Sequence, residues 1–189
     1  MRLIVAITGS SGAIYGIRLL EALHAAPEVE VHLILSKGGK LTAALETGRK
    51  AREIEKLAQH VHSDQDLAAS IASGSFRTAG MIVAPCSMKT LSGIVHSYAD
   101  NLVVRAADVV LKEGRKLVLM PRETPLHVGH CRLLLQAAEL GAVVAPPIPA
   151  FYGKPRTIDD LINHSVGRVL DLFGIESGLV RRWQGARRR

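Results

Sequence analysis

The sequence predicts an open, mostly parallel α/β sheet with helices on both faces, which is a three-layer arrangement. Five short apolar runs rich in β-branched residues recur along the 189 residues. Several of these runs are continuously apolar, which is typical of strands covered on both faces. Helix-like stretches separate the runs, and this alternation favours parallel strands joined by right-handed crossovers. The sequence contains no repeat or linker, so we expect one domain.

The expected strands are short runs in which Val, Ile, Leu and Ala dominate. In chain order they are Leu3–Ile7, Val29–Leu35, Met81–Ala84, Leu117–Met120 and Ala142–Ala145. Gly9 closely follows the first strand, and Pro85 directly follows the third. The stretch Pro146–Pro149 ends the fifth strand, and we expect it to project an arm ahead of the last helix.

Each expected helix places apolar side chains three or four residues apart, so that they share one face. The clearest helices are expected at Ala13–Ala25, Asn101–Glu113, Pro125–Leu140 and Ile158–Phe173. Between residues 53 and 76 the pattern is weakest, and we expect one helix and a Gly/Ser loop there.

Composition and charge are those of a globular protein of the cytoplasm. Hydrophobic residues make up 48% of the chain and charged residues 22%. The apolar runs fall short of the ~20 residues of a membrane span, and the N-terminal run is too short for a signal peptide. The net charge is +7, but five arginines lie among the last nine residues and the remainder carries +2. A basic tail explains this charge, so nucleic acid is not the expected partner.

Polar residues follow each expected strand, which places them at one edge of the sheet. Ligands of such sheets bind beyond the carboxyl ends of the strands, where the strand order reverses. Five polar loops at this edge therefore predict a single large site. These loops are Thr8–Gly12, Ser36–Gly39, Pro85–Thr90, Pro121–Thr124 and Phe151–Lys154.

The first loop, within the stretch ITGSSGAIYG, favours a bound mononucleotide. Glycines let backbone approach a ligand, and hydroxyls with N–H groups at a helix N-terminus can receive a phosphate. The spacing G-x-x-G-x-x-x-G differs from the dinucleotide fingerprint G-x-G-x-x-G. Ser36 ends the second strand, where NAD-binding chains carry an acidic residue, and Lys37 follows. FMN therefore fits better than NAD, and a purely structural Gly-rich turn is the alternative.

Cations beyond the first two loops suggest a second anionic ligand. Arg105 and Lys112 are seven residues apart, which is two turns along one helix face. Together with Arg122 they could clamp an anion, and a solvated charged face is the other interpretation.

Other reactive side chains indicate a function less clearly. Cys86 could be a nucleophile, but a lone cysteine is more often a small buried hydrophobe. His127 and His130 lack an evident third ligand, so we expect no metal site there. Glu46 follows a predicted helix, where surface carboxylates are routine, and composition alone would not select it.

Several motifs together resemble flavin prenyltransferases of the UbiX type. Val104–Val109 and PRETPLH (Pro121–His127) are specific to that group, whereas the Gly-rich loop alone is not. The resemblance runs from Arg2 to about Ala186 and includes Thr8–Gly16, Pro85–Thr90, Asn101–Glu113, Pro121–Leu126 and Pro149–Tyr152. It implies a Rossmann-like or flavodoxin-like subunit of a homo-oligomer, often a dodecamer. One domain at 1–186 would be followed by a basic tail at 187–189.

The resemblance implies an enzyme that prenylates FMN. Such enzymes join the dimethylallyl group of dimethylallyl monophosphate to N5 of reduced FMN, close a fourth ring through C6 and release phosphate. The product, prenylated FMN, passes to a UbiD-type decarboxylase in ubiquinone biosynthesis or the metabolism of aromatic acids. We expect no metal, membrane or nucleic acid to take part.

The resemblance also assigns roles to individual residues. Ser11 and Glu46 match positions linked to proton handling. Positions that match flavin contacts are Gly9, Ser10, Ser11, Ser36, Ser87, Met88, Lys89, Thr90 and Arg122. Positions that match the allyl phosphate or its neighbourhood are Arg105, Lys112, Glu123, Tyr152, Arg168 and Trp183.

The residue types suit this chemistry. Cations stabilise a leaving phosphate without a metal, which agrees with a sequence that has no Asp-rich Mg²⁺ motif. The electron-rich flavin and aromatic faces such as Tyr152 or Trp183 can stabilise an allyl cation. Ring closure removes the C6 proton and protonates the prenyl chain, for which Glu46 with Ser11 as relay is the candidate.

Two other functions stay open. A flavin-dependent decarboxylase that acts on peptidyl or pantothenoyl cysteine, or on 4-hydroxy-3-polyprenylbenzoate, would use a similar flavin site. The cysteine decarboxylases typically carry P-A-S-A-N-T in the third loop and a histidine on the first helix. Here the loop reads P-C-S-M-K-T and no histidine precedes His24. The other alternative is a flavin carrier without catalysis, which would have no need of Arg105 and Lys112.

Overall fold

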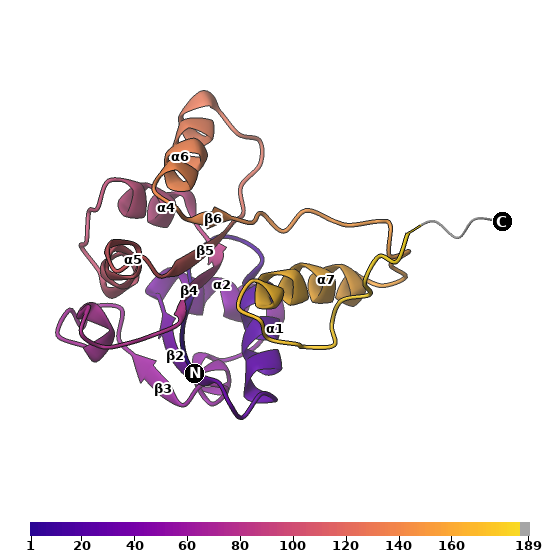
Figure 1. Cartoon of the computed structure of the whole chain (residues 1–189), viewed down its shortest axis with the longest axis horizontal. Helices are drawn as coiled ribbons and strands as arrows, with labels where there is room; N and C mark the ends of the chain where they lie inside the picture. Colours follow the sequence, from indigo (N-terminus) through magenta and orange to yellow (C-terminus); the bar gives the residue numbers. More distant parts are fainter. Residues whose placement is uncertain (186–189) are drawn as a thin grey trace.

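The computed structural model describes residues 1–185, in which a parallel sheet of six strands lies between two layers of helices (Figure 1). Neighbouring strands follow the order β3–β2–β1–β4–β5–β6. The strands are β1 (Arg2–Ile7), β2 (Glu30–Leu35), β3 (His60–His62), β4 (Gly80–Cys86), β5 (Lys116–Pro121) and β6 (Val143–Val144). The expected open, parallel, three-layer α/β fold is confirmed. The predicted basic tail at 187–189 lies outside the described residues.

The edge strand β3 corrects the expectation of one helix and a Gly/Ser loop between residues 53 and 76. The helix there is only α3 (Ala51–Glu55), and a 3₁₀ helix (Ser70–Ala72) follows β3. β3 has three residues, two of them histidines, so it has no apolar run by which the sequence could have predicted it. Without β3 the strands follow the flavodoxin order 2-1-3-4-5, and with β3 they follow the Rossmann order 3-2-1-4-5-6.

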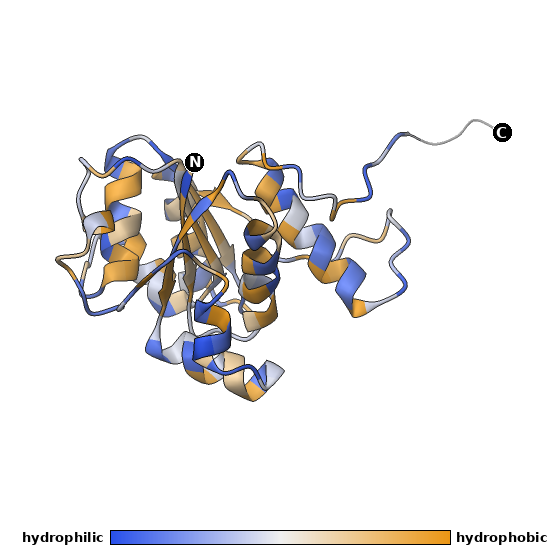
Figure 2. Cartoon of the chain, turned by 90° about the horizontal axis from the view of Figure 1, so that it is seen from below, coloured by the Kyte–Doolittle hydropathy of each residue, from blue (hydrophilic) through white to orange (hydrophobic). Residues whose placement is uncertain are grey.

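Alternate residues of each strand face separate cores on the two sides of the sheet. Val5 and Ile7 of β1 belong to one core, whereas Ile4 and Ala6 belong to the other. In Figure 2 the strands at the centre carry hydrophobic colours and helices flank them. The remaining helices are α1 (Ala13–His24), α2 (Lys37–Thr47), α4 (Met88–Val95), α5 (Leu102–Lys112), α6 (Val128–Glu139) and α7 (Ile158–Asp171). α1 and α7 contribute to the first core, and α4 and α5 to the second.

Capping side chains set several helix boundaries. Asn101 accepts the N–H of Val104 at 3.1 Å and thereby begins α5. α6 begins at Val128 and not at Pro125, because His127 caps it by accepting the N–H of His130. Glu46 lies in the last turn of α2, which corrects the expectation that it follows a helix.

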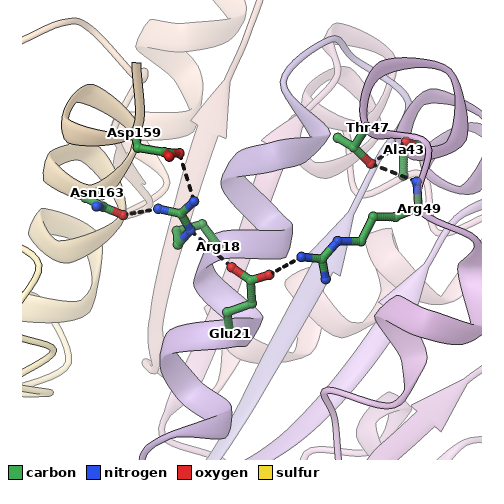
Figure 3. A network of polar contacts seen from close by, with 7 residues as sticks. All are labelled: Arg18, Glu21, Ala43, Thr47, Arg49, Asp159 and Asn163. Atoms are coloured by element: carbon green, nitrogen blue, oxygen red, sulfur yellow. Dashed lines mark hydrogen bonds and ion pairs between the residues drawn. The ribbon is translucent and has the colours of Figure 1, made fainter. Parts of the chain in front are cut away.

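A polar network anchors α7 to α1 (Figure 3). Arg18 on α1 donates to Asp159 at 2.9 Å and to Asn163, both on α7. Glu21 accepts hydrogen bonds from Arg18 at 3.1 Å and from Arg49 at 2.6 Å. The same cluster therefore also joins α1 to the turn after α2.

α6 and the arm between β6 and α7 project from the body of the molecule (Figure 1). α6 buries only Ala137 of its 12 residues. The arm at 145–157 forms no helix or strand, as the Pro-rich stretch predicts. Across residues 1–185, the helices are too short or too polar to cross a membrane.

Candidate active site

A buried threonine joins the loops that follow β1 and β4. The Thr8 hydroxyl donates to the carbonyl of Pro85 at 2.7 Å and accepts the backbone N–H of Ser87 at 2.8 Å. The Thr8 N–H donates to the same carbonyl at 3.2 Å. β1 and β4 are the strands at which the order reverses, so these bonds fix the two sides of the switch point.

Glycines bring the first and second loops into backbone contact. A Cβ atom on Gly9 would lie 3.0 Å from Gly38 Cα, and a Cβ on Gly38 would lie 3.1 Å from Gly9 Cα. Ser36 begins α2 by accepting the N–H of Gly39 at 3.0 Å. Side chains at Gly9 or Gly38 would force the loops apart, so both glycines have a structural role beside any ligand contact.

A polar cavity of about 520 Å³ opens at this edge between the ends of β1, β2 and β4. It brings together the predicted flavin contacts Gly9, Ser36, Ser87, Lys89 and Thr90. Thr8 and Lys37 also line it, as expected from the first two polar loops. Asp64 follows the unpredicted strand β3 and Asn101 precedes α5, and sequence reasoning selected neither as a site residue.

The residues around the cavity fit a phosphorylated flavin. Ser87 caps α4, whose N-terminus favours an anion, and Lys89 in the first turn of α4 also lines the cavity. The hydroxyl of Ser10 is buried and forms no hydrogen bond within residues 1–185. A buried hydroxyl without a partner is unfavourable unless a ligand satisfies it. Met88 differs from the other predicted contacts, because its side chain packs against the second core.

Glu46 occupies the N-terminus of α1. One of its carboxylate oxygens accepts the N–H of Gly12 at 2.8 Å and that of Ala13 at 3.0 Å. The sequence suggested these amides as a phosphate site, but the carboxylate already uses them. The α4 terminus is therefore the better place for a flavin phosphate.

The Glu46 carboxylate is held ionised. Burial acts to raise its pKa, but a hydrogen bond from Ser11, the amides of Gly12 and Ala13 and the charge of Arg122 together lower the pKa below its ordinary value. At neutral pH the Glu46 carboxylate can accept a proton or a hydrogen bond, but it has no proton to donate. Ser11 directly precedes Gly12, whose N–H binds Glu46, so the structure places the two predicted proton carriers near each other.

Arg122 lies on the α1 side of the site, where it follows β5. Its backbone N–H donates to the carbonyl of Cys86 at 3.3 Å, and its side chain approaches Gly12. Burial raises the pKa of Tyr15, and the Arg122 charge offsets part of that rise. Burial also raises the pKa of the Cys86 thiol to about 12. A thiol so hard to ionise is a poor nucleophile, so Cys86 acts as a small hydrophobe.

The two cations of α5 lie away from the cavity within one chain. Arg105 donates to the carbonyl of Ala72 at 3.2 Å and pairs with Asp108 at 3.1 Å. Lys112 pairs with Glu113 at 2.8 Å at the end of α5, four residues before β5 begins. Lys112 is therefore at the amino edge of the sheet, whereas Arg122 follows the carboxyl end of β5.

Three other predicted substrate residues gather at the arm and α7. The Tyr152 hydroxyl lies 3.1 Å from His164 Nε2, and its ring packs edge-on against Trp183 with 5.9 Å between centroids. Arg168 pairs with Asp171 at 2.8 Å. Glu123 is separate from this group and accepts the N–H of Thr124 at 3.2 Å.

Comparison with known proteins identifies the family. The family model described as Flavoprotein matches residues 1–170. The flavin prenyltransferase UbiX of Escherichia coli K12 is 59% identical over 187 residues, which are 98% of this chain and 99% of that protein. The chain belongs to the UbiX family of flavin prenyltransferases. Sequence reasoning had named this family from PRETPLH and the neighbouring motifs.

Solved structures of UbiX proteins match the whole fold. A dodecameric FMN-dependent UbiX-like decarboxylase from Escherichia coli O157:H7 is 57% identical, with a TM-score of 0.96 over 98% of this chain and 100% of that one. AnUbiX (PadA1), solved with FMN and dimethylallyl pyrophosphate, is 50% identical, with a TM-score of 0.95 over 98% of both chains. The UbiX family therefore includes a solved complex of this fold with a flavin and an allyl phosphate.

Proposed function

We propose that this chain is a metal-independent flavin prenyltransferase. It transfers the dimethylallyl group of dimethylallyl monophosphate to N5 and C6 of reduced FMN, and it supplies prenylated FMN to a UbiD-type decarboxylase. The observation that carries this proposal is the near-complete likeness to a UbiX protein that holds FMN together with an allyl phosphate. The two free cysteines, Cys86 and Cys131, suit the reducing cytoplasm.

The cavity at the switch point is the proposed flavin site. Lys89 and the N-terminus of α4 would bind the phosphate, and the free hydroxyl of Ser10 would donate to a flavin acceptor. Ser36 and Ser87 cap helices here, so their positions are fixed before any ligand binds. FMN supplies the electron-rich ring that is alkylated.

Glu46 and Ser11 are the proposed proton carriers. A carboxylate with a lowered pKa accepts a proton only transiently, which suits a relay that returns the C6 proton to the prenyl chain. The charge of Arg122, which already lowers this pKa, keeps the group ready to accept again. In the overall step the allylic C–O, N5–H and C6–H bonds break and bonds from the prenyl group to N5 and C6 form. The N5 proton leaves with the phosphate, and the C6 proton passes to the prenyl chain.

We also propose that the enzyme works as a homo-oligomer, with a dodecamer as the expected state. α6, the residues that flank it and the arm expose apolar side chains that a lone chain would leave in water. These residues are Leu126, Val128, Leu135, Leu140, Ile148 and Phe151. Assembly through them would bring the α5 cations and the Tyr152–Trp183 pair of neighbouring copies to each cavity, where the allyl phosphate needs positive and aromatic partners.

The test is anaerobic incubation of the protein with reduced FMN and dimethylallyl monophosphate, followed by mass spectrometry of the extracted flavin. We expect a flavin heavier by one C5 unit and release of free phosphate. Flavin that binds tightly but keeps its mass would contradict the proposal and indicate a carrier. Release of CO₂ from an aromatic or cysteinyl acid, without a change of flavin mass, would indicate a decarboxylase.

A further inference from the structure

Three histidines and a glutamate gather at the β3 edge of the sheet, away from the flavin cavity. The parallel register places His32 of β2 beside His60 of β3, and His62 lies two residues further along β3 on the same face. Glu30 begins β2, two residues before His32. Figure 1 shows β3 beside β2 at this end of the molecule. The cluster depends on β3, and so the sequence alone did not reveal it.

The donor atoms of this cluster converge on one point. Glu30 Oε1 lies 2.9 Å from His60 Nε2 and 3.5 Å from His32 Nε2. All three atoms lie within 4.8 Å of one another. Ligand atoms about 2.0–2.1 Å from a tetrahedral zinc ion are about 3.3 Å apart, so small side-chain movements suffice to enclose an ion.

Two further residues hold these ligands in place. Arg2 donates to Glu30 Oε2 at 3.0 Å, which leaves Oε1 for an ion. His32 Nδ1 lies 3.0 Å from His62 Nε2. If His32 Nδ1 carries the hydrogen and donates it to His62, then His32 Nε2 carries no hydrogen. Its lone pair is then free to bind an ion in the cluster. Histidine ligands of metals commonly have such a partner on their second nitrogen.

His32 is the strongest sign of a missing ligand. Its side chain is only 4% exposed, and its Nε2 atom is buried with no hydrogen bond within residues 1–185. A buried ring nitrogen that lacks a hydrogen bond is unfavourable unless a ligand satisfies it.

We propose that Glu30, His32 and His60 bind one divalent transition-metal ion, with Zn²⁺ as the best fit. Two imidazoles and one carboxylate form a common zinc ligand set, with water in the fourth position. The exposed sides of Glu30 and His60, 38% and 49% accessible, give the ion a path from solvent.

The role of the ion is structural. β3 is a strand of three residues at the edge of the sheet, so few backbone hydrogen bonds hold it. An ion bound by β2 and β3 together ties this strand to the sheet and steadies Asp64, which follows β3 and lines the flavin cavity. The site lies outside the cavity, and the proposed prenyl transfer does not depend on it.

The test is titration of the chelator-treated full chain with Zn²⁺ by calorimetry and with Co²⁺ by visible spectroscopy. We expect one ion per chain and the absorption of tetrahedral Co²⁺. His60→Gln, at an exposed position, and Glu30→Gln, at a partly buried one, should abolish binding. His62→Gln should weaken it by about 10–100-fold, as expected for the partner of a ligand. Zn²⁺ should raise the unfolding temperature of the native chain but not that of His60→Gln.

Controls separate this site from other histidines. His96→Gln removes an exposed histidine at the C-terminal end of α4, outside the cluster, and should leave the affinity unchanged. His127→Gln with His130→Gln removes the second histidine pair, whose rings are 3.7 Å apart. Absence of saturable Zn²⁺ binding would overturn the proposal. Binding that survives His60→Gln but disappears with the His127 and His130 changes would also overturn it.

Discussion

Side chains at the flavin edge, where the cavity opens, are satisfied by contacts within the chain. Many apolar side chains of the projecting part, which is α6 and the arm, are exposed. At the flavin edge, Thr8 joins two loops through buried hydrogen bonds, and Glu46 satisfies the amides at the start of α1. In α6 and the arm, Leu135 and Phe151 are 59% and 72% exposed. The first region is completed by its own chain, whereas the second has apolar surface that the same chain does not cover.

This difference indicates how the site is divided. Five of the nine predicted flavin contacts line one cavity within a chain, and none of the predicted allyl-phosphate contacts lines it. Lys112 is at the amino edge of the sheet, and Tyr152 is on the arm. The proposed assembly would divide the site, with the flavin cavity formed within one chain and the second-substrate residues supplied by neighbouring copies.

The largest effect should come from Lys112→Ala. Loss of a cation that stabilises the leaving phosphate should lower the prenylation rate by on the order of 10²-fold. Reduced FMN should bind as before, because Lys112 lies away from the flavin cavity of its own chain. The measurement is the rate of prenylated-flavin formation beside a flavin titration. Lys56→Ala, at an exposed lysine outside the site, is the control, and equal losses in both variants would contradict the division of the site.

A second large effect is expected from Phe151→Asp in the arm. A charge on this exposed apolar side chain should oppose assembly, so light scattering should find smaller particles. The rate should fall by about tenfold or more, while flavin affinity stays within about twofold, because the cavity belongs to one chain. An unchanged particle mass would show that the arm is not part of an interface.

Much of the fold and of the flavin edge could be predicted from the sequence, and the features that were not predicted have physical explanations. Apolar runs predicted five of the strands, because strands covered on both faces must be continuously apolar. β3 was not predicted because its three residues form no apolar run, and they are a strand only because they pair with β2. The flavin loops were predictable because they follow strands. The role of Glu46 at the start of α1 was not, because that contact joins residues 34 positions apart.

An intermediate effect is expected from Thr8→Val at the flavin edge. The change leaves the Ser87 N–H without its buried acceptor, which should cost about 1–3 kcal/mol of unfolding free energy. Chemical denaturation measures this loss, and flavin affinity should fall with it. Thr47→Val, where the hydroxyl bonds only near its own helix, should have a smaller effect. Equal effects at both sites would contradict the role of Thr8 as the bond between the loops.

The smallest effect should be the change in unfolding free energy caused by Glu46→Gln, and this change should depend on pH. Its folded-state pKa is lowered, so the ionised group stabilises the protein above its ordinary pKa of 4.5, and this contribution is lost as the pH falls through the folded value. At pH 7 the variant should lose about 0.5–1 kcal/mol as a helix cap. Thermal melts should show the gap between native and variant narrowing below pH 4.5. A gap independent of pH would show that the charge of Glu46 does not matter.

The most direct measurement of the central claim is complementation between two inactive variants. Glu46→Gln disables the flavin side of a site and Lys112→Ala disables the allyl-phosphate side. Co-expressed with different tags and purified as mixed assemblies, they should form prenylated flavin at about a quarter of the native rate, since random mixing rebuilds a site from one intact half of each chain. Mixed assemblies as inactive as either parent would show that each chain completes its own site, which would contradict the account.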